Sequence, residues 1–224
     1  MTNIPFRRRP ILWILCCAFA LVFAWSTYKP VSRADWWMEN ILVLMVIAVA
    51  TVGYKHVRIS DLSYVFIFCF LCLHEVGAHY TYDFVPIGYW LKDTFHFKRN
   101  DYDRIVHFCF GFFWAYPIRE MFIQAARTRK FWTYSAPVGI VLSVSAVYEI
   151  IEAYMAQLYP GMEEQYVGMQ GDVFDSQRDM TCAIVGAILC MILAAIAQYE
   201  GHLPDDPRAM TMIEPEHRHY QERR

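Results

Sequence analysis

Residues 11–28, ILWILCCAFALVFAWSTY, decide the fold, because they form a run of eighteen residues without a charged side chain. A helix that crosses a bilayer needs about 20 mostly apolar residues. Over all 224 residues, 57% are hydrophobic and only 19% are charged, whereas about 25% are charged in an ordinary soluble domain. The composition therefore excludes a disordered chain, disfavours a soluble domain and indicates a membrane protein.

Six windows are long and apolar enough, or nearly so, to cross a membrane. They cover residues 11–28, 37–54, 62–80, 102–122, 132–154 and 179–199. We therefore predict an all-α, polytopic bundle of six transmembrane helices over residues 11–199, with an N-terminal segment 1–10 and a polar tail 200–224. The basic run Arg7-Arg8-Arg9 before the first window also resembles a signal peptide, but the length of the window and its bulky Trp25 favour an uncleaved helix.

The distribution of Lys and Arg predicts how the bundle is oriented. The loops on one side, together with both termini, hold thirteen of these residues, and the loops on the other side hold six. Because cytoplasmic loops are enriched in Lys and Arg, we predict that both termini are cytoplasmic. Residues 29–36, 81–101 and 155–178 would then face outward, into the periplasm of a Gram-negative cell. The formal net charge of −2 gives no reason to expect nucleic acid as a partner, and membrane lipid is the expected surrounding.

Ionisable side chains inside membrane spans are costly and point to function. Four clusters of them lie at the predicted outer ends of the windows. These clusters comprise His74, Glu75 and His79; Asp103, Arg104 and His107; Glu149 and Glu152; and Asp172, Asp175, Arg178 and Asp179. Residues four apart share one face of a helix, as in the Glu75/His79 and Asp103/His107 pairs. We expect the four clusters to meet at a common centre.

The charges in these clusters do not balance. Seven carboxyl groups face two arginines, so five negative charges are in surplus if every acid is ionised. Carboxylates about 4 Å apart repel by roughly 4 kcal/mol at an effective dielectric constant near 20, so the centre must gain protons or a cation. Histidines beside carboxylates favour zinc, manganese or iron over magnesium or calcium. The predicted metal ligands are Glu75, His79, Asp103, His107 and Asp179, with His74, Asp172 and Asp175 as additional ligands. A metal-free proton or substrate site and purely structural pairing are the alternatives.

Three motifs carry a resemblance to a known family. They are His74-Glu75-x-x-x-His79-Tyr80, Asn100-Asp101-Tyr102-Asp103-Arg104-x-x-His107-Phe108 and Gly171-Asp172-x-x-Asp175-x-Gln177-x-Asp179-Met180. Over nearly its whole length the chain resembles the YjdF family of bacterial inner-membrane proteins, a domain of unknown function. The resemblance implies a multi-pass protein of the inner membrane and supplies no reaction.

The second half of the chain is also similar to VanZ-like membrane proteins, which are linked to glycopeptide resistance. Asp103, Arg104, His107 and Phe108 match an Asp-Lys/Arg-x-x-His-Phe pattern of that family. A Glu-x-x-Gln pair of the family is approximated by Glu149 and Glu152. This similarity implies a role that faces the cell envelope.

The leading functional hypothesis is an enzyme that uses a bound metal to hydrolyse or transfer part of a lipid or cell-envelope precursor. Glu149 or Glu152 would serve as general base, and Arg104 or Arg178 would hold an anionic head group. A cation or proton transporter is the second hypothesis, and a structural or stress-related membrane factor is the third. Either of the connections 80–101 and 157–171 could cover the site, and anchoring in the membrane interface is the alternative for both.

Overall fold

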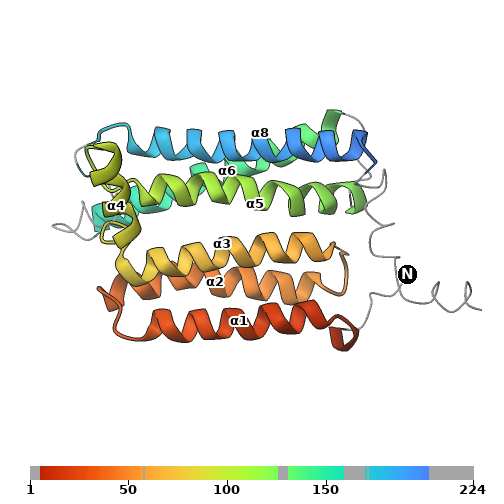
Figure 1. Cartoon of the computed structure of the whole chain (residues 1–224), viewed down its shortest axis with the longest axis horizontal. Coiled ribbons are helices and arrows are strands. Elements are labelled where there is room, and N and C mark those ends of the chain that lie inside the picture. The colour runs from red at the N-terminus through yellow and green to blue at the C-terminus, as the bar shows by residue number, and fades with distance from the viewer. Residues whose placement is uncertain (1–5, 58, 126–130, 159–169, 171, 202–224) are drawn as a thin grey trace, which may run out of the picture.

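The computed structural model describes residues 6–57, 59–125, 131–158, 170 and 172–201, which form a bundle of long helices (Figure 1). A short 3-10 helix, Phe6–Arg8, precedes the first long helix. The α-helices are α1 (Pro10–Thr27), α2 (Arg33–Gly53), α3 (Asp61–Tyr80), α4 (Pro86–Phe95), α5 (Tyr102–Ala125), α6 (Phe131–Leu158) and α8 (Asp175–Tyr199). The predicted all-α, multi-helix architecture is confirmed.

The helices begin where the sequence offers capping residues. Pro10 is placed in the first turn of α1, where its missing N–H costs nothing because that group would have no partner in the helix. Ser32 accepts a hydrogen bond from the Asp35 N–H at the start of α2. Ser60 accepts a hydrogen bond from the Ser63 N–H at the start of α3. Each serine satisfies an N–H that has no partner inside its helix.

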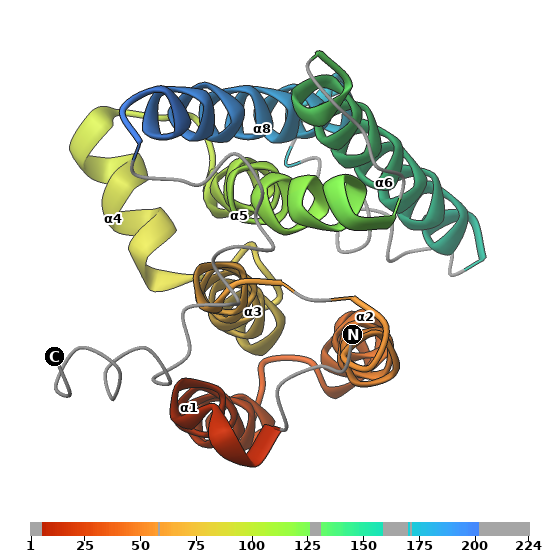
Figure 2. The same cartoon turned by 90° about the vertical axis from the view of Figure 1, so that its right-hand side faces the viewer.

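Five helices of the described chain are long and apolar enough to cross a membrane, namely α1, α2, α3, α8 and α6 as far as Met155. Helix α5 is comparably long, with 24 residues, but it is more polar and carries Arg119 and Glu120. It lies between α3, α6 and α8 (Figure 2). Its polar side chains therefore meet other helices instead of lipid.

The backbones of α5 and α8 touch through two glycines. A Cβ atom added to Gly111 would lie 1.8 Å from the carbonyl oxygen of Ala183, and one added to Gly186 would lie 2.1 Å from that of Phe108. Small residues of this kind let membrane helices approach closely. The contact holds the beginning of α5, which carries one polar cluster, against the beginning of α8, which carries another.

Much of the outer surface of the bundle is apolar. Leu21 on α1 is 73% exposed, Val49 on α2 is 67% exposed and Ile192 on α8 is 51% exposed. An apolar surface of this extent is unusual for a soluble monomer and suits contact with lipid.

The polar clusters lie at one end of the bundle, called here the polar end, where α1, α3 and α6 end and α2, α5 and α8 begin (Figure 1). Helix α8 begins at Asp175, four residues before the predicted start at 179. Between α3 and α5, within the connection 80–101, the chain forms the short helix α4. The opposite end, where α1 begins and α2 ends, is called the basic end because it carries Arg8, Arg9 and Lys55.

Candidate functional site

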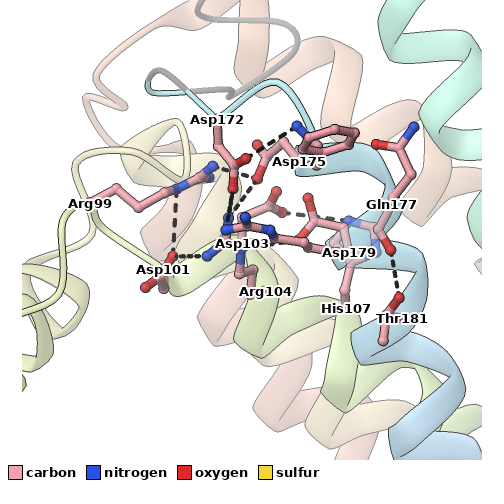
Figure 3. A network of polar contacts seen from close by, with 12 residues as sticks. Arg99, Asp101, Asp103, Arg104, His107, Asp172, Asp175, Gln177, Asp179 and Thr181 are labelled. Atoms are coloured by element: carbon pink, nitrogen blue, oxygen red, sulfur yellow. Dashed lines mark hydrogen bonds and ion pairs between the residues drawn. The ribbon is translucent and has the colours of Figure 1, made fainter.

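The first two turns of α5 and of α8 bring Asp103, His107 and Asp179 together at the polar end (Figure 3). One ligand atom from each of these side chains lies within 4.8 Å of the other two. Asp103 and His107 are one helical turn apart, so both point from α5 toward α8. Asp179 and His107 are buried. Two carboxylates and one imidazole at this spacing are a donor set that suits a borderline divalent metal.

Helix α6 adds carboxylates to the same place. The Nε2 atom of His107 lies 3.4 Å from Glu149 Oε1 and 3.7 Å from Asp103 Oδ1. On the other side of the ring, Nδ1 lies 3.4 Å from the Ser145 hydroxyl. Glu152, one turn beyond Glu149, interacts electrostatically with Asp103, Glu149 and Asp179. The structure therefore joins three of the four predicted clusters around His107.

The arginines near this centre are already engaged in ion pairs. Arg104 Nη1 lies 2.8 Å from Asp101 Oδ1, and its Nη2 lies 2.7 Å from Asp172 Oδ2 and 3.1 Å from Asp175 Oδ1 (Figure 3). Arg99, which sequence reasoning missed, also binds Asp175 and lies 3.5 Å from Asp101. Arg99, from the α4–α5 connection, and Arg104, from α5, thus hold the beginning of α8 in place through ion pairs.

Asp172 lies in the turn before α8 and has two cationic partners. Desolvation opposes ionisation, but the Phe174 N–H and the guanidinium groups of Arg178 and Arg104 together hold the pKa of Asp172 below its ordinary value. Arg178 Nη1 lies 2.6 Å from Asp172 Oδ2 and its side chain is 55% exposed. Of the two arginines predicted to hold a head group, Arg178 is therefore the accessible one and Arg104 is the one fixed by ion pairs.

A second group of acids has no comparable neutralisation. This acidic group consists of Glu39, Asp103, Glu149, Glu152 and Asp179. The closest Arg104 atom to Asp179 is Nε, at 4.0 Å from Oδ1. The buried Asp179 Oδ1 and Glu149 Oε1 atoms accept no hydrogen bond from the described residues. Five carboxylates with so little compensation need bound protons or a bound cation.

Sequence reasoning missed Glu39, which reaches the acidic group from α2. The Tyr148 hydroxyl donates to Glu39 Oε2 at 2.9 Å, and His74 Nε2 lies 3.8 Å from the same oxygen. Glu39 also interacts electrostatically with Asp103. It is an acid within a predicted membrane span, near its outer end. The criterion used for the other acids, an ionisable side chain inside a membrane span, was therefore sufficient to identify Glu39 as well.

The turn after α3 explains how His74 is held. Thr81 and Tyr82 have positive φ angles of 53° and 55°, and the chain turns back over the helix. The Tyr82 ring then lies where a side chain on Gly77 would stand, 2.6 Å from the position of a Cβ atom. This close approach places the Tyr82 hydroxyl 2.6 Å from His74 Nδ1.

The predicted ligands Glu75 and His79 contact a different part of the bundle. Glu75 is fully buried and hydrogen-bonds with the Ser26 hydroxyl. His79 Nδ1 lies 3.0 Å from the Ser26 carbonyl oxygen, and its ring stacks on Trp25 at 4.5 Å between centroids. The two residues share a face, as their spacing predicted, but that face points to α1. His74, which precedes Glu75 in the sequence, points to Glu39 instead.

The connections at the polar end are tied to one another. Gln170 donates to Asp83 Oδ1 at 2.6 Å and accepts from the Asn100 N–H at 3.0 Å. Burial raises the pKa of Asp83 to about 6, against the lowering effect of the Gln170 hydrogen bond. Of the connection 157–171, expected to cover the site, residues 159–169 and 171 lie outside the described residues.

Comparison with known proteins places this bundle in a family. Residues 11–200 match the family described as "Predicted membrane protein (DUF2238)". The chain belongs to this family. It is also 30% identical over 177 residues to the "Inner membrane protein YjdF" of Escherichia coli (strain K12), an alignment that covers 78% of this chain and 84% of that protein.

Family membership agrees with the motifs that suggested it and with the apolar helices of the structure. The chain is a multi-pass protein of the bacterial inner membrane. No solved structure matches it. The similarity to VanZ-like proteins stays an expectation from the sequence.

Proposed function

We propose that this membrane protein binds a divalent metal ion between α5 and α8 and uses it to hydrolyse or transfer part of a lipid or cell-envelope precursor. The observation that carries the proposal is the convergence of Asp103, His107 and Asp179 ligand atoms within 4.8 Å. Their surroundings support it, because the buried Asp179 Oδ1 and Glu149 Oε1 atoms accept no hydrogen bond from the described residues.

The donor set indicates zinc, manganese or iron. Asp103, His107 and Asp179 would be the ligands, and Glu149 stands 3.4 Å from His107, within reach of a fourth position. A bound metal of this kind supplies a hydroxide-like nucleophile from water and polarises a phosphoryl or carbonyl oxygen. Glu152 belongs to the acidic group but is not one of the three proposed metal ligands. It is the general base in this proposal.

Arg104 and Arg178 would have different roles in this site. Arg104 lies within 3.1 Å of Asp101, Asp172 and Asp175 and would hold α8 in place against α5. The exposed Arg178 would contact the anionic head group of the substrate. Planar guanidinium groups bind phosphate and carboxylate in a bidentate manner, so a phosphate-bearing lipid precursor fits this edge of the site.

The proposed orientation uses six spans and places both termini in the cytoplasm. The position of α5 between three other helices supports counting it as a span despite its polarity. The excess of Lys and Arg at the basic end supports a cytoplasmic location of that end. Reporter fusions test this arrangement: a fluorescent protein at the C-terminus should be bright, and alkaline phosphatase at the same place should be inactive. The reverse pattern would refute the orientation.

The metal proposal is tested by elemental analysis. Purified protein is loaded with zinc, manganese or iron, freed of excess metal and analysed for metal per chain. We expect about one ion in the wild type and a loss in His107→Ala and Asp179→Asn. Asp61→Asn is the control, because Asp61 pairs with Arg9 at the basic end and is 53% exposed. A wild type that retains no metal, or variants that retain as much as the control, would refute the site.

Location at one end of the bundle favours an enzyme over a transporter. Transporters commonly bind their cargo near the middle of the membrane, whereas Asp103 and Asp179 lie in the first two turns of their helices. Metal flux into proteoliposomes that is abolished in Asp179→Asn would instead establish transport.

A further inference from the structure

A cavity of about 500 Å³ lies between α1, α2 and α3 in the half of the bundle toward the basic end. Its walls are largely apolar and include Leu12, Phe19, Ile47, Phe68 and Leu71. Figure 2 views the bundle from the basic end, with α1, α2 and α3 arranged as a triangle. The cavity shares no lining residue with the acidic group.

The shape of the cavity suits a chain-like apolar ligand. Its lining residues on α3 run from Tyr64 to Leu71, which corresponds to about 10 Å along a helix that rises 1.5 Å per residue. Pockets of roughly 300–1,000 Å³ hold small-molecule ligands. An empty apolar space would forfeit dispersion contacts along all of its walls, and the surrounding bilayer supplies acyl chains that fill it.

The mouth of the cavity carries positive charge. Lys55, which follows α2, is a lining residue and is exposed. Arg9, by contrast, is paired with Asp61. An apolar cavity whose mouth carries a lysine that no described carboxylate pairs with is complementary to a lipid with an anionic head group.

We propose that this cavity binds one acyl chain of an anionic phospholipid, with the phosphate of the head group against Lys55. One cationic side chain near a membrane surface favours anionic lipid by about fivefold. The wild type should therefore retain phosphatidylglycerol about fivefold better than phosphatidylcholine with the same acyl chains. This inference does not depend on the proposed metal site.

Native mass spectrometry of the full-length protein tests the proposal. Delipidated protein is incubated in detergent with phosphatidylglycerol or phosphatidylcholine, and the lipid-bound fraction is measured. Lys55→Gln should reduce retention of phosphatidylglycerol to that of phosphatidylcholine. Ala50→Trp, in the wall of the cavity, should reduce retention of both lipids. Ala48→Trp on the exposed face of α2 is the matched control and should behave as the wild type.

Three results would overturn the proposal. The first is equal retention of the two lipids by the wild type, and the second is an Ala50→Trp variant that binds as well as Ala48→Trp. The third is a Lys55→Gln variant with unchanged preference for phosphatidylglycerol. Lys55 is exposed, so its substitution keeps the test valid if the tryptophan variant fails to fold.

Discussion

Gly186→Ala tests how closely α5 and α8 must pack for the site to form. The added Cβ would lie 2.1 Å from the Phe108 carbonyl oxygen, whereas ordinary contact begins at 3.4 Å. The difference means that the two helices must separate locally by about 1.3 Å. Overpacking of this kind costs about 1–3 kcal/mol. We therefore expect a lower melting temperature of the detergent-purified protein, followed by its intrinsic tryptophan fluorescence.

The same substitution should weaken metal binding. Gly186 lies seven residues after Asp179 on α8, about 10 Å along the helix. Metal sites tolerate ligand distances within about 0.2 Å, so a displacement transmitted from Gly186 would disturb the approach of Asp179 to Asp103. We expect a loss of metal affinity of about 10–100-fold, as for other substitutions that displace ligands.

Gly139→Ala is the control for both measurements. A Cβ atom at Gly139 on α6 meets no atom within 4 Å, so the alanine adds no clash. It also removes the helix penalty of glycine, which amounts to about 0.5–1 kcal/mol. The melting temperature of Gly139→Ala should therefore be equal to or above that of the wild type. If Gly186→Ala were as stable as Gly139→Ala and bound metal normally, the close packing of α5 and α8 would not be what positions the site.

Four further substitutions test other parts of the polar end. Because burial raises the pKa of Asp83 from its ordinary value of 3.8 to about 6 in the folded protein, ionisation removes stability as the pH rises from about 4 to about 6. Asp83→Asn, which keeps an acceptor for Gln170, should raise the melting temperature at pH 7.5 and raise it much less at pH 4.5; a pH-independent difference would contradict this. Arg104→Ala leaves the buried Asp175 with Arg99 as its remaining cationic partner and should destabilise the protein by about 1.5–3 kcal/mol, whereas Arg178→Ala removes an exposed pair worth about 0–1 kcal/mol; equal effects in denaturant titrations would show that Arg104 does not hold α8 against α5. Finally, Glu75→Gln should leave the metal content of the loaded protein unchanged, since Glu75 hydrogen-bonds with Ser26; loss of metal would restore Glu75 as a ligand.

Residue spacing correctly grouped side chains on individual helices. Asp103 and His107 act from one face of α5, and Glu75 and His79 both contact Ser26. A spacing of four residues is a property of a single helix, so the sequence contains it in full. The expectation that the clusters would gather at one end followed in the same way from the alternating direction of successive helices.

The rotation of each helix about its own axis was decided only by tertiary packing. His74 and Glu75 are adjacent, and successive residues on a helix point about 100° apart, yet His74 faces Glu39 while Glu75 faces α1. Which of the two points to the acidic group depends on contacts between helices, such as that of Ser26 on α1 with Glu75. The same packing places Glu39 of α2 in the acidic group, next to Tyr148 of α6.

Apolar runs, capping residues and the alternation of loops along the chain determined the membrane class and the polar end of this protein, because each of these is a local property of the sequence. The tertiary structure decided which carboxylates are neutralised by Arg99 and Arg104 and which remain in the acidic group. The physical reason is that ion pairing depends on distances of a few ångströms between residues about 70 positions apart, and those distances exist only after the helices have packed.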